Sequence, residues 1–280
     1  MVTMHVRRWG HSNREEMAVS EGLVVVTGGA SGIGLACAKA MASFHEGVVL
    51  VDANGDGLEG AKGEVEALGA LVHGFQCDVA DHDAQAELAK KVESDIGAVR
   101  TLVTAAGVLN NPATFMDMDL KENARVWDIN YHGTVFSVRA FARAMMDRNK
   151  GAVATIGSIN SFSPLPLPAY CPSKTAIMRV TQMLAVELGR FSIRVNGVAP
   201  TYVLSPAIKA RIDSGERDPD TIRKAGAIEM FVYPEDIANV VAFLCSDKAA
   251  AVTGLMMPVD AGWEAATSYR SFAGGVPWDE

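Results

Sequence analysis

From residue 22 onward, short runs of β-branched and aliphatic residues alternate with longer amphipathic stretches, and this alternation restricts the possible folds most strongly. We expect strands at residues 23–27, 48–52, 71–76, 100–105, 152–157, 193–199 and 255–259. Between them, apolar residues recur with helical spacing, which is typical of helices that pack on one face. Because right-handed strand–helix–strand units place their strands in parallel, the pattern predicts one α/β domain with a doubly wound, seven-stranded parallel sheet flanked by helices.

No linker or repeat divides the chain, so we expect a single catalytic domain over residues 21–262. Residues 202–233 depart from the alternation and are expected to form a substrate lid, with a solvated helical excursion as the alternative. Residues 1–20 lack the apolar core of a secretory signal and are expected to form a flexible extension; an arginine-rich organelle address is the alternative. Residues 263–280 are the expected C-terminal tail.

The charge balance argues against nucleic-acid and membrane partners. The chain has 25 basic and 33 acidic side chains and a net charge of −8, whereas such binders concentrate positive charge. No apolar run is long enough to span a bilayer. The four cysteines have neither metal-ligand nor disulfide-framework spacing. We therefore expect a cytoplasmic protein that binds a small molecule and no metal.

The first predicted strand runs into a glycine-rich turn, TGGASGIG at residues 27–34, that opens the first predicted helix. Glycine permits unusual backbone angles and leaves room for a diphosphate to approach the positive end of the helix dipole. A turn in this position is typical of the dinucleotide-binding Rossmann fold. It predicts cofactor contacts from Gly28, Ser31, Gly32, Ile33 and Gly34.

Asp52 ends the second predicted strand, where the dinucleotide fold places the acid that binds the ribose. A carboxylate accepts hydrogen bonds from a free 2′-hydroxyl but repels a 2′-phosphate, and Ala53 and Asn54 supply no cation for such a phosphate. These residues favour NAD over NADP. The alternative role for Asp52 is a helix N-cap.

Tyr170 and Lys174 are four residues apart at the start of a predicted helix, so their side chains share one face. Ser158 follows a predicted strand at the carboxyl edge of the sheet, where open α/β sheets bind ligands. Tyrosine is a weak base at neutral pH because its ordinary pKa is about 10. A nearby ammonium group and an oxidised nicotinamide would favour the phenolate, so the three residues predict an acid–base site.

These motifs, in this order, resemble the short-chain dehydrogenase/reductase family over about residues 22–262. The resemblance also rests on the PEDIA segment that begins at residue 234 and on TGLMMPVDAGW, which begins at residue 253. It implies a catalytic tetrad of Asn130, Ser158, Tyr170 and Lys174, in which Asn130 holds a water that connects Lys174 to solvent. It further implies adenine contacts from Asp78 and Val79, although Asp78 could instead cap a helix and Asn130 could be a buried amide.

The resemblance adds cofactor contacts from Ala106, Gly107, Pro200, Val203 and Ser205 as well as Tyr170 and Lys174. Two motifs depart from the family. Thr104-Ala105-Ala106-Gly107 stands where Asn-Asn-Ala-Gly is common, which removes two amides that would tie the strand ends together. Thr201 replaces the glycine that usually follows Pro200, which leaves the local backbone path open.

In the expected reaction Tyr170 takes the alcohol proton as hydride leaves for NAD, while Lys174 orients the ribose and Ser158 holds the substrate oxygen. We expect substrate contacts from Ser158, Asn160, Tyr170 and Leu204 and an apolar pocket that includes Phe162, Leu165, Leu167, Val203, Met230 and Phe231. These residues favour an NAD-dependent dehydrogenase or ketone reductase for apolar or cyclic secondary alcohols. The alternatives are a 3-oxoacyl-carrier-type reductase and a non-catalytic NAD-sensing protein. The resemblance also implies a homotetramer.

Overall fold

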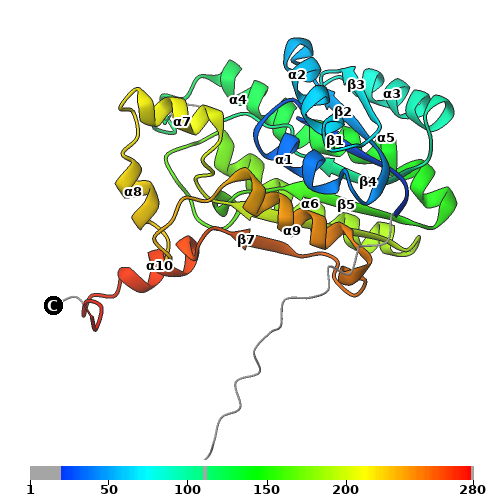
Figure 1. The fold of residues 1–280 in the computed structure, drawn as a ribbon. Coiled ribbons are helices and arrows are strands. Elements are labelled where there is room, and N and C mark those ends of the chain that lie inside the picture. The colour runs from blue at the N-terminus through cyan, green and yellow to red at the C-terminus, as the bar shows by residue number, and fades with distance from the viewer. Residues whose placement is uncertain (1–19, 110–111, 279–280) are drawn as a thin grey trace, which may run out of the picture.

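The structure, a computed structural model, describes residues 20–109 and 112–278, so most of the expected N-terminal extension and the last two tail residues lie outside the described residues (Figure 1). Seven strands form one sheet in the order β3-β2-β1-β4-β5-β6-β7, and every adjacent pair is parallel. The predicted doubly wound sheet is therefore confirmed. The strands are β1 (Ser20–Thr27), β2 (His45–Asp52), β3 (Val72–Gln76), β4 (Val99–Thr104), β5 (Gly151–Ile156), β6 (Ile193–Pro200) and β7 (Met256–Val259).

Helices cover both faces of the sheet (Figure 1). They are α1 (Gly32–Met41), α2 (Gly55–Glu66), α3 (His82–Asp95), α4 (Leu120–Trp127), α5 (Gly133–Arg148), α6 (Tyr170–Gly189), α7 (Pro206–Asp213), α8 (Pro219–Lys224), α9 (Pro234–Cys245) and α10 (Trp263–Arg270). Along β1, Val24 and Val26 pack into a core with α1, α2 and α9, while Leu23 and Val25 pack into a second core with α3, α5 and α6. This two-sided burial explains why the strand is apolar throughout.

β1 and β2 begin earlier than their predicted apolar runs. In β2 the reason is His45, a polar residue that is buried at the start of the strand. Its Nε2 atom hydrogen-bonds the Thr101 hydroxyl of β4 at 2.9 Å, so the ring satisfies its polar atoms inside the sheet. Hydrophobic runs mark the middle of a buried strand better than its ends.

The helical segment between the predicted strands at residues 100–105 and 152–157 is interrupted by a π-helical turn, Asp128–His132, between α4 and α5. Single π turns inside α-helices are frequent at functional sites. The turn contains Asn130, which is fully buried, and the Thr134 hydroxyl donates to the Asn130 carbonyl at 2.8 Å. The turn therefore aims one amide side chain inward, toward the carboxyl ends of the strands.

The segment expected as a lid folds into α7 and α8, which Figure 1 shows together at one end of the molecule. A parallel bridge between Val203 and Val232 joins the two ends of this segment. Helix α10 then follows the last strand, and its Arg270 guanidinium donates to the carbonyl oxygens of residues 224, 225 and 226 at the end of α8. The C-terminal helix is thus bonded to the predicted lid of its own chain.

Gly34→Ala tests the tight packing at the start of α1. A Cβ at Gly34 would lie 2.0 Å from the Gly28 carbonyl oxygen, so backbone would have to move. We expect a loss of roughly 1–3 kcal/mol in unfolding free energy, the range for overpacking, measured by urea denaturation. The matched control is Gly60→Ala in α2, where the Cβ meets open space and should stabilise the helix by about 0.5–1 kcal/mol. Equal stability of the two variants would contradict the prediction.

Candidate active site

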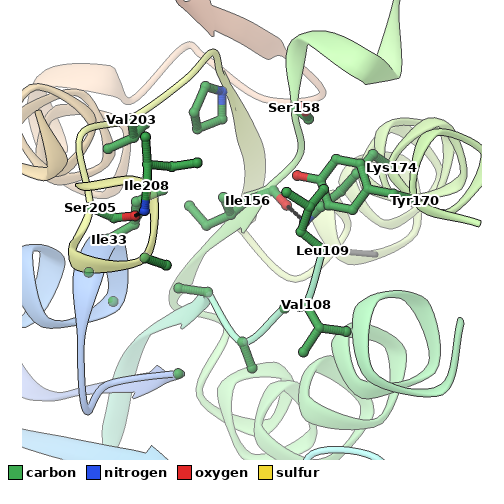
Figure 2. Close-up of a pocket in the computed structure, with 18 of the residues that line it drawn as sticks. Ile33, Val108, Leu109, Ile156, Ser158, Tyr170, Lys174, Val203, Ser205 and Ile208 are labelled. Atoms are coloured by element: carbon green, nitrogen blue, oxygen red, sulfur yellow. Dashed lines mark hydrogen bonds between the residues drawn. The ribbon is translucent and has the colours of Figure 1, made fainter. Parts of the chain in front are cut away.

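A cleft of about 620 Å³ lies at the carboxyl ends of the strands, at the point where the strand order reverses between β1 and β4. Figure 2 shows Ser158, Tyr170 and Lys174 on one side of it, with Val203, Ser205 and Ile208 across from them. The expected site residues that line this cleft are Gly28, Ser31, Gly32, Ile33, Gly34, Asp52, Asp78, Val79, Ala106, Gly107, Ser158, Asn160, Tyr170, Lys174, Pro200, Val203 and Ser205. Asn130 and Leu204 do not line it.

The glycine-rich turn leaves an open cradle at the start of α1. Gly28 has a φ of +68°, and a Cβ there would lie 2.6 Å from the Ala106 amide nitrogen. Gly32 has a φ of +53°, and its Cβ would meet only the Ser205 Cβ, at 3.9 Å. Ser31, the N-cap of α1, makes no side-chain capping bond, so its hydroxyl leaves the helix amides available. This open, amide-rich helix terminus fits the diphosphate of a dinucleotide.

Asp52 faces the cleft and also fixes the glycine turn. Its carboxylate oxygens accept hydrogen bonds from the Ala30 amide at 3.1 Å and from the Asn54 amide at 2.9 Å. The N-cap of α2 is Asn54, whose side chain accepts from Gly57, so the capping alternative for Asp52 is wrong. Each carboxylate oxygen keeps lone-pair capacity for a further donor in the cleft, such as a ribose hydroxyl.

Asp78 follows β3 at the same edge and is exposed beside the cleft. It accepts one hydrogen bond, from the Ala80 amide at 2.9 Å. Asp81, and not Asp78, is the N-cap of α3. The carboxylate is therefore compatible with the adenine contact that the resemblance implies.

A backbone hydrogen bond joins the ends of β1 and β4 where the family's two amides are missing. The Ala105 amide donates to the Thr27 carbonyl at 3.1 Å, and Gly28 lies directly against Ala106. The buried Thr104 hydroxyl has no hydrogen-bond partner among the described residues. Close backbone contact therefore holds the strand ends together without asparagine side chains.

Lys174 is buried, and its ammonium group donates to the Ile156 carbonyl at the end of β5, at 2.8 Å. The same ammonium nitrogen lies 5.5 Å from the centre of the Tyr170 ring. Burial lowers the pKa of Lys174 to about 8. The α6 register thus places both groups in one pocket, as the spacing predicts.

The ionisation of Tyr170 differs from the expectation that Lys174 favours the phenolate. Burial raises the pKa of Tyr170 to about 12, and a hydrogen bond with the Ser158 side chain offsets only part of that rise. The reason is that desolvation penalises the anion more than the protein's own groups stabilise it. With only these groups around it, Tyr170 is a neutral phenol at pH 7.

Asn130 holds the loop that follows β4. Its side-chain oxygen accepts from the Val108 amide at 2.8 Å, and its side-chain nitrogen donates to the Val108 carbonyl at 3.0 Å. The same nitrogen donates to the Ser173 hydroxyl of α6 at 3.2 Å. The buried-amide alternative for Asn130 is therefore confirmed, and the amide fixes residues beside the cleft. That Asn130 holds a water stays a prediction.

The cleft contains part of the expected apolar pocket. Leu165, Leu167 and Val203 line it, whereas Phe162 and Met230 are exposed and Phe231 and Leu204 do not line it. The Leu204 amide donates to the Val232 carbonyl at 2.8 Å, next to the Val203–Val232 bridge. Residues that sequence reasoning missed include Val108, Leu109, Ile159, Tyr202, Ile208, Arg211 and Arg217.

One signal could have found two of these residues. Ser205 accepts a hydrogen bond from the Ile208 amide and caps α7, and Pro206 occupies its first turn. A helix that begins there places Ile208 and Arg211 on one face, three residues apart. The Ser-Pro pair therefore predicts the helix start, and with it the face that lines the cleft.

Comparison with known proteins identifies the family. Residues 28–264 match the family model described as "Enoyl-(Acyl carrier protein) reductase". D-threitol dehydrogenase of Mycolicibacterium smegmatis is 33% identical over 242 residues, which cover 86% of this chain and 92% of that protein. Cis-4-hydroxycyclohexanecarboxylate dehydrogenase of Sinomonas cyclohexanicum is 32% identical over 252 residues, covering 89% of this chain and 98% of that protein.

The fold agrees with these matches. A solved short-chain type dehydrogenase/reductase from Mycobacterium ulcerans superimposes with a TM-score of 0.83 at 28% identity, covering 92% of this chain and 97% of that one. The family match extends from Gly28, directly after β1, to the start of α10 and includes strands β2 to β7. The chain therefore belongs to the short-chain dehydrogenase/reductase family of oxidoreductases.

Proposed function

We propose that the protein is an NAD-dependent dehydrogenase that interconverts a secondary alcohol and its ketone, with an apolar or cyclic carbon skeleton. The observation that carries this proposal is the convergence of Ser158, Tyr170 and Lys174 at one side of the cleft that contains the glycine turn and Asp52. The two relatives named above support it, since one is named for a polyol and the other for a cyclic hydroxy acid.

The cofactor would extend along the carboxyl ends of the strands. Its diphosphate would contact the open start of α1 at Ser31 and Gly32 and the Ser205 hydroxyl beside them, and its adenine would contact Asp78 and Val79. Gly107 lies beside Lys174: a Cβ there would be 3.6 Å from the ammonium nitrogen, so glycine keeps this part of the cleft open. When bound, the nicotinamide ring supplies the hydride acceptor or donor.

The protein's own groups move the proton. In ketone reduction the neutral Tyr170 phenol donates its proton to the carbonyl oxygen, which Ser158 positions by hydrogen bonding. In alcohol oxidation the phenolate must accept that proton, and the raised pKa of Tyr170 makes this form scarce at neutral pH. Lys174 provides the adjacent positive charge, and Asn130 bonds both Val108 in the loop after β4 and Ser173 on α6.

The NAD preference rests on the charge distribution in the cleft. Asp52 stands at the ribose position, and a 2′-phosphate there would be repelled. Among the described residues, the cations that line the cleft are Lys174, Arg211 and Arg217, and all three come from segments that follow β5. None of them lies on the β2 side of the sheet, where a 2′-phosphate would need a partner.

The homotetramer implied by the resemblance also remains part of the proposal. It would form through α5 and α6, and α6 exposes Met183 and Val186 on its outer side. Such exposed apolar side chains on one helix suit packing against a second copy of the chain.

Tyr170→Phe should reduce turnover by about 10²–10⁴-fold, because it removes the only hydroxyl proposed to exchange a proton with the substrate oxygen. NAD affinity, measured by isothermal titration, should stay within a few-fold of wild type. Tyr269→Phe is the matched control, since Tyr269 is exposed on α10 and does not line the cleft. Retention of more than a tenth of the wild-type rate in the Tyr170 variant would rule out the assigned acid–base group.

Asp52→Ala should lower kcat/KM with NAD and reduce the ratio of kcat/KM with NAD to that with NADP. The variant loses both the group that accepts hydrogen bonds from the ribose and the charge that repels a 2′-phosphate. The measurement is kcat/KM with each cofactor at a fixed alcohol concentration. Asp56→Ala, an exposed acid on α2 that is not part of the cleft, should leave the ratio unchanged. Equal use of both cofactors by the wild-type enzyme would defeat the selectivity argument.

Alcohol oxidation should accelerate with pH, and ketone reduction should not. Because the pKa of Tyr170 is raised to about 12, the phenolate fraction grows up to about tenfold for each pH unit below that value. The phenol that donates in reduction stays protonated throughout the range. The test is kcat/KM in both directions from pH 6 to 7, where Lys174, with its pKa of about 8, keeps its charge. A flat oxidation profile would count against the proposed base.

A further inference from the structure

Two arginines of the segment between β6 and α9 line the cleft. Arg211 lies on α7, on the same face as Ile208, and Arg217 lies in the turn between α7 and α8. Both side chains are half-buried. The Arg217 amide donates to the Arg211 carbonyl at 3.1 Å, so the turn folds back and brings the two residues together.

The acidic residues around Arg217 have other partners. Asp213 pairs with Lys209 at 2.9 Å, and Asp218 caps α8 through two backbone amides. Asp220 and Glu229 both pair with Arg223, and Glu216 accepts a hydrogen bond from the Ser214 hydroxyl. Among the described residues no carboxylate pairs with Arg217, whose guanidinium donates at 2.9 Å to the Glu216 carbonyl.

Apolar side chains line much of the cleft that these arginines share with Tyr170. They include Leu109, Leu165, Leu167 and Ile208, and Figure 2 shows Leu109 near Tyr170 and Ile208 across the pocket. A ligand that fills this cleft therefore meets a proton donor, hydrocarbon and positive charge. In a chain with a net charge of −8, two arginines directed at one cleft make a local site for an anion.

We propose that Arg217, with Arg211, binds a carboxylate of the substrate, which makes the substrate a hydroxy acid with an apolar, cyclic carbon skeleton. This inference rests on the proposed function and narrows its substrate class. Arginine suits the role because its planar guanidinium forms paired, charge-assisted hydrogen bonds with a carboxylate. The apolar lining of the cleft then selects the carbon skeleton, and the arginines select the charge.

The test measures binding in the NAD-saturated protein, with cyclohexanecarboxylate and the neutral cyclohexanecarboxamide as probes in isothermal titration. The wild-type protein should bind the acid at least about tenfold more tightly than the amide, as expected for a charge-assisted contact. Arg217→Met should lower acid affinity by roughly ten- to a hundredfold and leave amide affinity unchanged. Arg211→Met should act in the same direction.

Lys209→Met is the matched control, because Lys209 carries the same charge on the same helix but is exposed and does not line the cleft. It should bind the acid like wild type. The inference is overturned if wild type fails to prefer the acid, including the case in which neither probe binds. It is also overturned if Arg217→Met lowers the affinity for NAD, titrated alone, and leaves the affinity for the acid unchanged. The arginine would then bind the cofactor's diphosphate.

Turnover separates this inference from the proposed function. With hydroxycyclohexanecarboxylates and their methyl esters as alcohols, NADH formation should show a higher kcat/KM for the acids. Equal values for acid and ester overturn the inference and leave the dehydrogenase assignment intact. Selective binding of the acid probe without NADH formation from any alcohol overturns the dehydrogenase assignment, while the carboxylate site stands.

Discussion

The burial of the Lys174 ammonium group sets the requirements that the surrounding elements satisfy. A charged group removed from water needs hydrogen-bond acceptors, and the last carbonyl of β5 provides one at 2.8 Å. That bond fixes the position of α6 relative to the sheet edge, and so it fixes Tyr170 one turn earlier. Even so, burial lowers the pKa of Lys174 to about 8, which brings its charge within reach of physiological pH. The burial of Lys174 therefore determines both the position of Lys174 and Tyr170 and the pKa of the Lys174 ammonium group.

A second constraint comes from the close approach of the strand ends. Gly28 contacts Ala106, and the Ala105 amide bonds Thr27, so β1 and β4 meet through backbone atoms. Asn130 then fixes the next residues of the β4 loop from inside the helix layer. The main chain at the ends of β1 and β4 consequently forms one boundary of the cleft, and side chains of α6 form another. Its shape depends on packed secondary structure, which is the arrangement that holds reacting groups in place best.

The sequence predicted the parallel sheet and about half of the residues that line the cleft, since these depend on local patterns. Hydrophobic periodicity locates strands and helices, and the glycine turn, Asp52 and the Tyr170–Lys174 spacing each have a local geometric meaning. The π turn at Asn130 could not be predicted in this way, because its extra residue is stabilised by tertiary bonds to Val108 and Ser173. The same limit applies to Leu204, which does not line the cleft and whose amide bonds Val232 beside the Val203–Val232 bridge. Tyr170 illustrates a different limit, because its ionisation depends on burial, which spacing alone does not reveal.

Helix α10 connects two segments that are far apart in the sequence and that each adjoin residues lining the cleft. Its Glu264 carboxylate accepts hydrogen bonds from Ser163, in the loop that follows Ser158, at 2.8 and 3.0 Å. At its other end, Arg270 donates to the carbonyls of residues 224–226, which follow the turn that contains Arg217. Both segments are therefore bonded to one short helix, so a displacement of that helix is transmitted to both. Their relative position is set from outside the cleft, by a helix none of whose residues lines it.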